Sequence, residues 1–198
     1  MFFIKNPSEK FSIPDWLSLY RILAIPLLSY LMIAGFRELF GIFLLISFLT
    51  DAMDGYLARK LNIETQRGAQ LDSIGDILTV FIGIVAAFKF EWAFMYKHLL
   101  LIIISFALYF LQLVIAFMRY GMPSSFHTIL AKISMVIQSV FLVWICLVGI
   151  SYALFVAAIS FSILEAIEEI ALTVKYDKWQ PNIKGIFWEI KESKSKEE

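Results

Sequence analysis

Cysteine and histidine are scarce in this chain of 198 residues, which contains one cysteine and two histidines. The single cysteine, Cys146, lies in an apolar run and has no partner for an internal disulfide, so we expect it to be a small buried hydrophobic residue. Charge is sparse as well, because charged residues make up 17% of the chain and the formal net charge is zero. We therefore expect no nucleic-acid partner.

Hydrophobic residues, by contrast, make up 60% of the chain, and the mean hydropathy is +0.78. Soluble domains contain roughly 45 to 50% apolar residues, so the composition indicates an integral, multi-pass membrane protein. No basic signal peptide precedes the first apolar segment, and we expect the apolar segments themselves to direct insertion. Six of them reach the roughly 20 residues that a spanning helix needs: 16–35, 38–59, 70–90, 97–118, 129–150 and 152–174.

The predicted fold is all-α, an integral membrane bundle of six transmembrane helices with a short N-terminal interfacial segment at residues 7–16. Residues 1–176 would form one membrane domain, and residues 177–198 a polar cytoplasmic tail. The sequence shows no internal repeat and no second domain.

Lysine and arginine are distributed unevenly between the two predicted sides of the membrane. One side holds Arg37, Lys89 and Lys97. The other side, with both termini, holds fourteen: Lys5, Lys10, Arg21, Arg59, Lys60, Arg67, Arg119, Lys132, Lys175, Lys178, Lys184, Lys191, Lys194 and Lys196. Because positive residues concentrate in cytoplasmic loops, we expect both termini to be cytoplasmic, with the protein in the inner or plasma membrane of a bacterium.

Four aspartates lie in one short segment of this apolar chain. Asp51 and Asp54 stand near the end of the second predicted span, and Asp72 and Asp76 near the start of the third, so both pairs fall on the cytoplasmic side. Spacings of three and four residues place each pair on one helix face. Carboxylates near lipid are costly unless neutralised, and Mg²⁺ or Mn²⁺ suits a cluster of oxygen ligands without cysteine or histidine. The spacing predicts a divalent-metal site.

Small residues and one arginine accompany the aspartates. Gly55 and Ala58 keep one helix face open, Gly68 stands where the third helix should begin, and Arg59 offers donors suited to phosphate oxygens. Each feature alone also has a structural interpretation, since aspartates cap helices and small residues pack membrane helices. Together, a metal site, an open backbone and a cation are typical of phosphoryl transfer.

The segment reads Asp-x-x-Asp-Gly-x-x-Ala-Arg, then eight residues, Gly, three residues, Asp, three residues and Asp. This pattern resembles the signature of the class I CDP-alcohol phosphatidyltransferase family and meets every fixed position. The resemblance implies that a CDP-linked lipid, usually CDP-diacylglycerol, gives its phosphatidyl group to a small polar alcohol and releases CMP. Membrane lipid is an expected partner. Family members are often homodimers, so the resemblance also implies a second copy of the chain as a partner.

Roles follow for individual residues. We interpret Asp51, Asp54 and Asp72 as ligands of two Mg²⁺ or Mn²⁺ ions, and Asp76 as shared between metal binding and proton transfer. The resemblance implies that Asp76 is the general base that deprotonates the acceptor hydroxyl. It also implies that the nucleotide contacts five positions: Asp54, Gly55, Ala58, Arg59 and Gly68.

The acceptor alcohol is less sharply indicated. Residues 13–26 are similar to the opening of phosphatidylglycerophosphate synthases, one branch of the family, and a later segment agrees at Ala131, Lys132 and Gln138. This makes glycerol 3-phosphate the first choice. Ser73 and Ile77 depart from that branch, which usually has proline and a basic residue at these positions. Serine, inositol and inositol phosphate are therefore alternative acceptors.

Two further groups are open to a functional or a structural interpretation. Cations on the cytoplasmic side are candidates for an acceptor phosphate or for topogenic charges: Arg67, Arg119, His127 and Lys132. Glu165, Glu168 and Glu169 share a face of the last span. These glutamates would either pair with Arg119 or Lys132 near the acceptor, or fix the packing of the bundle.

A transporter or channel whose aspartates line an ion path is the rival from another functional class. The carboxylates gather at one end of two spans and do not follow the spans through the membrane, and the sequence shows no symmetric pair of broken helices. A scaffold without catalysis is disfavoured because every motif aspartate is present.

Overall fold

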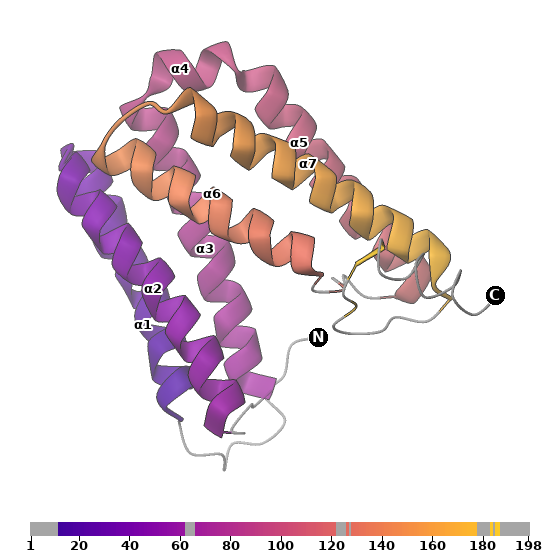
Figure 1. Ribbon diagram of the computed structural model, residues 1–198. Coiled ribbons are helices and arrows are strands. Elements are labelled where there is room, and N and C mark those ends of the chain that lie inside the picture. The colour runs from indigo at the N-terminus through magenta and orange to yellow at the C-terminus, as the bar shows by residue number, and fades with distance from the viewer. Residues whose placement is uncertain are drawn as a thin grey trace. The chain divides into compact units, whose positions relative to one another are not determined.

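A computed structural model describes residues 12–61, 66–121, 126, 128–177, 183 and 185–186. Within these residues the protein is all-helical, with seven helices and no strand (Figure 1). The helices are α1 (Ile13–Ala34), α2 (Arg37–Leu61), α3 (Gln66–Phe90), α4 (Trp92–Lys97), α5 (Leu99–Tyr120), α6 (Ile129–Leu147) and α7 (Tyr152–Lys175).

Each of the six predicted spans coincides with a long helix, whereas the short α4 was not expected. Four stretches within the described residues are long and apolar enough to cross a membrane, namely Asp15–Ala34, Gln70–Phe90, Leu99–Tyr120 and Ile129–Leu147. The protein is therefore a helical membrane protein with at least these candidate spans. Of the predicted interfacial segment, Ile13 to Trp16 form the first turn of α1, and residues 7–11 lie outside the described part of the chain.

The chain divides into two compact units. Unit 1 comprises residues 1–92 and 142–150, and unit 2 comprises residues 93–141 and 151–198. The last part of α6 thus belongs to unit 1 and its first part to unit 2. Each unit is described by itself.

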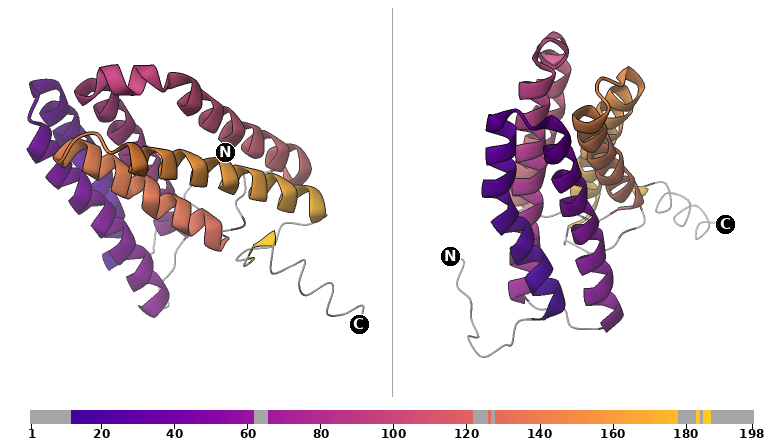
Figure 2. Two further views of the ribbon diagram at one scale, coloured as in Figure 1. Left: turned by 45° about the horizontal axis from the view of Figure 1, so that its top comes forward. Right: turned by 90° about the vertical axis from the view of Figure 1, so that its left-hand side faces the viewer.

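Helix α1 lies beside both α2 and α3 in unit 1 (Figures 1 and 2). Its inner face follows the three- and four-residue spacing of a helix and changes character along its length. The first buried positions are polar and the later ones are apolar: Asp15, Ser18, Arg21, Ala24, Leu28 and Leu31. The buried face of α1 is therefore polar at its N-terminal end and hydrophobic at its C-terminal end.

Both ends of α1 are fixed by local hydrogen bonds. At the N-terminus, Ser12 and Asp15 form a capping box in which each side chain accepts a hydrogen bond from the other residue's backbone N–H. At the C-terminus, Gly35 adopts a left-handed conformation with φ of 83°, and the Phe36 N–H donates to the Leu31 carbonyl at 2.9 Å. This tight turn lets α2 begin at Arg37 and return along α1.

Arg37 joins three helix ends on the side of unit 1 away from the predicted metal site. Its Nη2 donates to Glu91 Oε1 at 2.6 Å and to the Ile145 carbonyl at 2.5 Å, and its Nε donates to the Cys146 carbonyl at 3.0 Å. The last carbonyls of a helix have no N–H partner within the helix, so Arg37 caps those at the end of α6. Asp51 follows Arg37 by fourteen residues, about 20 Å along the axis of α2.

Helices α5 and α7 run in the same direction in unit 2, because their starts and their ends each meet. At the start, the ring of His98 lies 5.0 Å from that of Phe155, and at the end the Tyr120 hydroxyl donates to the Tyr176 carbonyl at 2.8 Å. Between them, Ser105 Oγ donates to Ser162 Oγ at 2.8 Å. A small core of Phe126, Leu172 and Ile183 closes the second end.

Candidate metal centre

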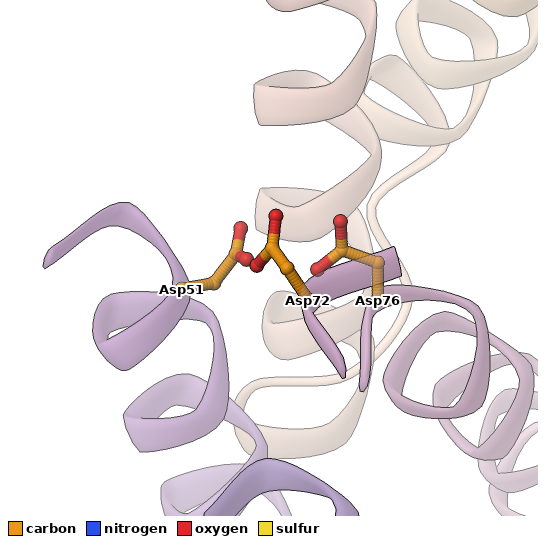
Figure 3. Close-up of side chains that lie close together, drawn as sticks. All are labelled: Asp51, Asp72 and Asp76. Carbon is orange, nitrogen blue, oxygen red and sulfur yellow. The ribbon is translucent and has the colours of Figure 1, made fainter. Parts of the chain in front are cut away.

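The structure brings together three of the four predicted metal ligands. One carboxylate oxygen from each of Asp51, Asp72 and Asp76 lies within 4.8 Å of the other two. Figure 3 shows the three carboxylates turned toward one another, Asp51 from α2 and the other two from neighbouring turns of α3. The predicted convergence of the second and third spans at their aspartates is therefore confirmed for these residues.

Helix phase explains why the carboxylates meet. On α2, buried Phe40, Leu44 and Ser47 precede Asp51 at helical spacing, so the face that packs in unit 1 continues into the aspartate. On α3, the four-residue spacing stacks Asp72 and Asp76 on one face. Packing of the apolar parts of the two helices thus fixes the position of the acidic residues at their ends.

The carboxylates remain open to a ligand although the surrounding helices are packed. The side chains of Asp51, Asp72 and Asp76 are 25%, 40% and 36% exposed, respectively. Arg21, which reaches them from α1, is 1% exposed. The cluster thus combines a buried arginine with three carboxylates that are accessible from outside.

Arg21 forms ion pairs with all three aspartates. Its Nη1 donates to Asp51 Oδ1 and to Asp76 Oδ1, and its Nη2 donates to Asp72 Oδ1. The fork of the guanidinium group allows one side chain to pair with carboxylates from two helices. Arg21 was predicted only as a topogenic charge, and this role was not predicted from the sequence. The signal was present, because an arginine inside an apolar run needs an anionic partner.

The donor set fits a hard divalent cation. The three aspartates and Arg21 together carry a formal charge of minus two, which one divalent ion balances. All three ligand atoms are carboxylate oxygens, the donors that Mg²⁺ and Mn²⁺ favour. Asp51, Asp72 and Asp76 are the described residues that could hold such an ion.

The sequence around this site, and most of the chain, matches a known protein family. Residues 11–164 match the sequence model of the CDP-alcohol phosphatidyltransferase family. The chain belongs to this family. The match begins just before α1 and ends within α7, and it includes the aspartates and Arg21.

Individual relatives point to two branches of the CDP-alcohol phosphatidyltransferases. The chain is 34% identical over 88 residues to a CDP-diacylglycerol--glycerol-3-phosphate 3-phosphatidyltransferase of Wigglesworthia glossinidia brevipalpis, covering 43% of this chain and 48% of the relative. It is 33% identical over 121 residues to the Bacillus subtilis protein of the same name, covering 54% and 63%.

A yeast relative represents the second branch. A cardiolipin synthase (CMP-forming) / mitochondrial hydrolase fusion protein of Schizosaccharomyces pombe is 36% identical over 66 residues, which cover 33% of this chain and 11% of that protein. The chain thus spans about half to two thirds of the length of the two bacterial relatives and a small part of the yeast protein.

The other signature positions lie on the helices that carry the aspartates. Asp54, Gly55, Ala58 and Arg59 belong to the last turns of α2, but their side chains lie outside the described part of the structure. Gly68 is half-buried in the first turn of α3. The assignment of Asp54 as a metal ligand and the nucleotide contacts of all five positions stay predictions.

The predicted acceptor-phosphate cations are only partly described. Arg119 at the end of α5 donates to Asp177 Oδ1 at 2.8 Å and to the Tyr176 carbonyl at 2.9 Å. Lys132 is exposed in the first turn of α6. The side chain of Arg67 and the whole of His127 lie outside the described residues. Arg119 thus holds the end of α7 in unit 2.

The glutamates of α7 bind backbone groups. Glu169 is fully buried, and both of its carboxylate oxygens accept from the Phe126 N–H, at 3.0 and 3.1 Å. Glu168 is 7% exposed and accepts from the Ile186 N–H at 3.1 Å. These two contacts connect α7 to Phe126, between α5 and α6, and to Ile186, beyond the end of α7. These contacts favour the packing interpretation for Glu168 and Glu169, and Glu165 is half-buried on the same helix.

Proposed function

We propose that this protein transfers a phosphatidyl group from CDP-diacylglycerol to glycerol 3-phosphate and releases CMP, in a reaction that depends on a divalent metal ion. The observation that carries the proposal is the meeting of Asp51, Asp72 and Asp76, three motif residues of a CDP-alcohol phosphatidyltransferase, at one open carboxylate cluster. The names of the bacterial relatives support glycerol 3-phosphate as the acceptor.

The aspartates are proposed to bind two Mg²⁺ or Mn²⁺ ions, with Asp54 completing the set of Asp51, Asp72 and Asp76. Bound at these carboxylates, the ions would neutralise the diphosphate of the CDP-lipid and the charge that develops on the leaving CMP. Asp54, Gly55, Ala58, Arg59 and Gly68 would hold the nucleotide, with the Arg59 fork directed at phosphate oxygens.

Asp76 is proposed as the general base. Its side chain is 36% exposed, so the carboxylate is accessible to a substrate hydroxyl. Asp76 would accept the proton of the acceptor hydroxyl as that oxygen attacks the phosphorus of the lipid phosphate. The new bond joins acceptor oxygen to phosphorus, and the bond to CMP breaks.

The site requires a membrane setting that gives it access to a lipid and to a water-soluble acceptor. We propose six transmembrane helices, with α2 and α7 joining the four apolar candidate spans, and a single membrane domain of residues 1–176 followed by a polar tail at 177–198. The positive-inside distribution supports a cytoplasmic site and cytoplasmic termini in a bacterial plasma membrane. Homodimerisation stays a prediction.

A substrate screen tests the proposal. Purified protein in detergent or nanodiscs is given labelled CDP-diacylglycerol with Mg²⁺ or Mn²⁺, and with glycerol 3-phosphate, serine, inositol, inositol phosphate or phosphatidylglycerol. We expect CMP release and a phosphatidylglycerophosphate product with glycerol 3-phosphate, and loss of both with EDTA. A product from another acceptor would reassign the branch. Ion flux in proteoliposomes without CMP release from any acceptor would favour the transporter.

A further inference from the structure

Arg21 is a buried cation whose charge is balanced by groups from two other helices. It is 1% exposed in α1, where apolar residues precede and follow it in the sequence. A buried charge is tolerated only with close partners, and Asp51 on α2 and Asp72 and Asp76 on α3 provide them. One side chain thus links α1, α2 and α3 at the acidic end.

These ion pairs use the carboxylates that the proposed metal ions need. The guanidinium group contacts Oδ1 of each aspartate, and the three carboxylates offer a ligand set within 4.8 Å. A divalent ion at that set would stand a few ångströms from the guanidinium, and two like charges repel strongly at such a distance in a partly buried site. The guanidinium and the metal ion therefore compete for the same negative charge.

We infer that Arg21 is a resident counter-ion, which holds the carboxylates together in the ion-free protein and gives up part of these contacts when a divalent cation binds. Arg21 is then a positioning residue that sets the affinity of the site for metal. This inference rests on the proposed function for one point, that divalent ions bind at these aspartates.

Gly75 leaves the space that the guanidinium occupies. A Cβ atom at this position would lie 3.3 Å from Arg21 Cζ and 3.5 Å from Nε and Nη2. The first distance is tighter than an ordinary contact, so a methyl group would press on the guanidinium without adding charge. Gly75 thus provides a second, milder way to disturb the ion pairs of Arg21.

The test measures Mn²⁺ binding by electron paramagnetic resonance on the purified full-length protein, with thermal unfolding followed in the absence and presence of saturating Mn²⁺. Removing the competing charge with Arg21→Gln should tighten Mn²⁺ binding about tenfold or more. The ion-free unfolding midpoint should fall by about 5 °C or more, because the aspartates then repel one another, and Mn²⁺ should raise it by more than in wild type.

Three variants make the result specific. Arg21→Lys keeps the positive charge but loses the planar fork, so its Mn²⁺ affinity should lie between those of wild type and Arg21→Gln. Gly75→Ala should tighten Mn²⁺ binding by about threefold. Arg37→Gln removes an arginine at the other end of unit 1 and should lower the unfolding midpoint equally with and without Mn²⁺.

The outcomes separate this inference from the proposed function. If wild type binds Mn²⁺ and releases CMP, but Arg21→Gln and Gly75→Ala bind Mn²⁺ with unchanged or weaker affinity, the counter-ion role is overturned and the enzyme stands. If wild type binds no Mn²⁺ and releases no CMP, the proposed function fails first. Should Arg21→Gln not yield folded protein, Gly75→Ala alone decides the question.

Discussion

Two acidic clusters in this protein use similar side chains for different purposes. The aspartates of unit 1 are 25 to 40% exposed and share one buried arginine, which leaves negative charge unbalanced. In unit 2, Glu168 and Glu169 are almost completely buried, and their carboxylates accept hydrogen bonds from backbone N–H groups. Both clusters are acidic and show helical spacing in the sequence, so exposure and the kind of contact distinguish the candidate ligand site from the structural anchor.

The largest contrast should appear in turnover. Asp76→Asn removes the proposed base and should lower CMP release by about 10² to 10⁴-fold. Binding of a CDP-nucleotide should change little, because the other ligands of the diphosphate remain. Both quantities can be measured on the same purified variant. Near-normal transferase activity in Asp76→Asn would refute the base assignment.

A substitution in unit 2 should have the opposite profile. Glu169→Leu leaves the buried Phe126 N–H without its acceptor, which should cost about 1 to 3 kcal/mol in free energy of unfolding. Unfolding in a denaturing detergent titration reports this loss. The Mn²⁺ concentration for half-maximal activity should stay at the wild-type value, and a large increase would mean that the two clusters are not functionally distinct.

Arg37→Met tests a structural ion pair in the same unit as the metal centre. The variant loses the bond to Glu91 and the two caps on the end of α6, so the free energy of unfolding should fall by about 1 to 2 kcal/mol. Mn²⁺ affinity, measured alongside, should be unchanged because Asp51 lies about 20 Å away along α2. Weaker Mn²⁺ binding would show that the two ends of unit 1 are coupled.

The smallest effect is expected for Ser105→Ala. The hydroxyl bond to Ser162 links α5 and α7, and such bonds between membrane helices contribute about 0.6 kcal/mol on average. A double-mutant cycle with Ser162→Ala isolates this coupling from the loss of the side chains. A coupling above about 2 kcal/mol would mark unit 2 as far more dependent on polar contacts than its apolar sequence indicates.

The sequence predicted the parts of this protein that depend on local pattern. The apolar runs located the six long helices, and the spacing of Asp51, Asp72 and Asp76 predicted that α2 and α3 meet at their carboxylates. Helical periodicity and span length suffice for these conclusions. The short α4 was not predicted, because a helix of six residues is too short to show a periodic pattern in the sequence.

The contacts of Arg21 and of the glutamates could not be predicted in the same way. Arg21 lies thirty residues before Asp51, and its pairing depends on how α1 packs against two other helices. Glu169 binds the backbone of Phe126, and a backbone N–H leaves no trace in a sequence pattern. Tertiary packing therefore decided which charged residues join the candidate site and which stabilise the fold.

Equilibrium Mn²⁺ binding to matched charge-removing variants tests whether the aspartates of unit 1 bind the metal ion. Asp51→Asn and Asp72→Asn each remove one carboxylate from the proposed metal centre, and Glu165→Gln removes one from the glutamate-bearing face of α7. Either aspartate variant should weaken Mn²⁺ binding by about tenfold or more, while Glu165→Gln should bind like wild type. Equal Mn²⁺ affinity in all of these proteins would contradict a metal centre at Asp51 and Asp72.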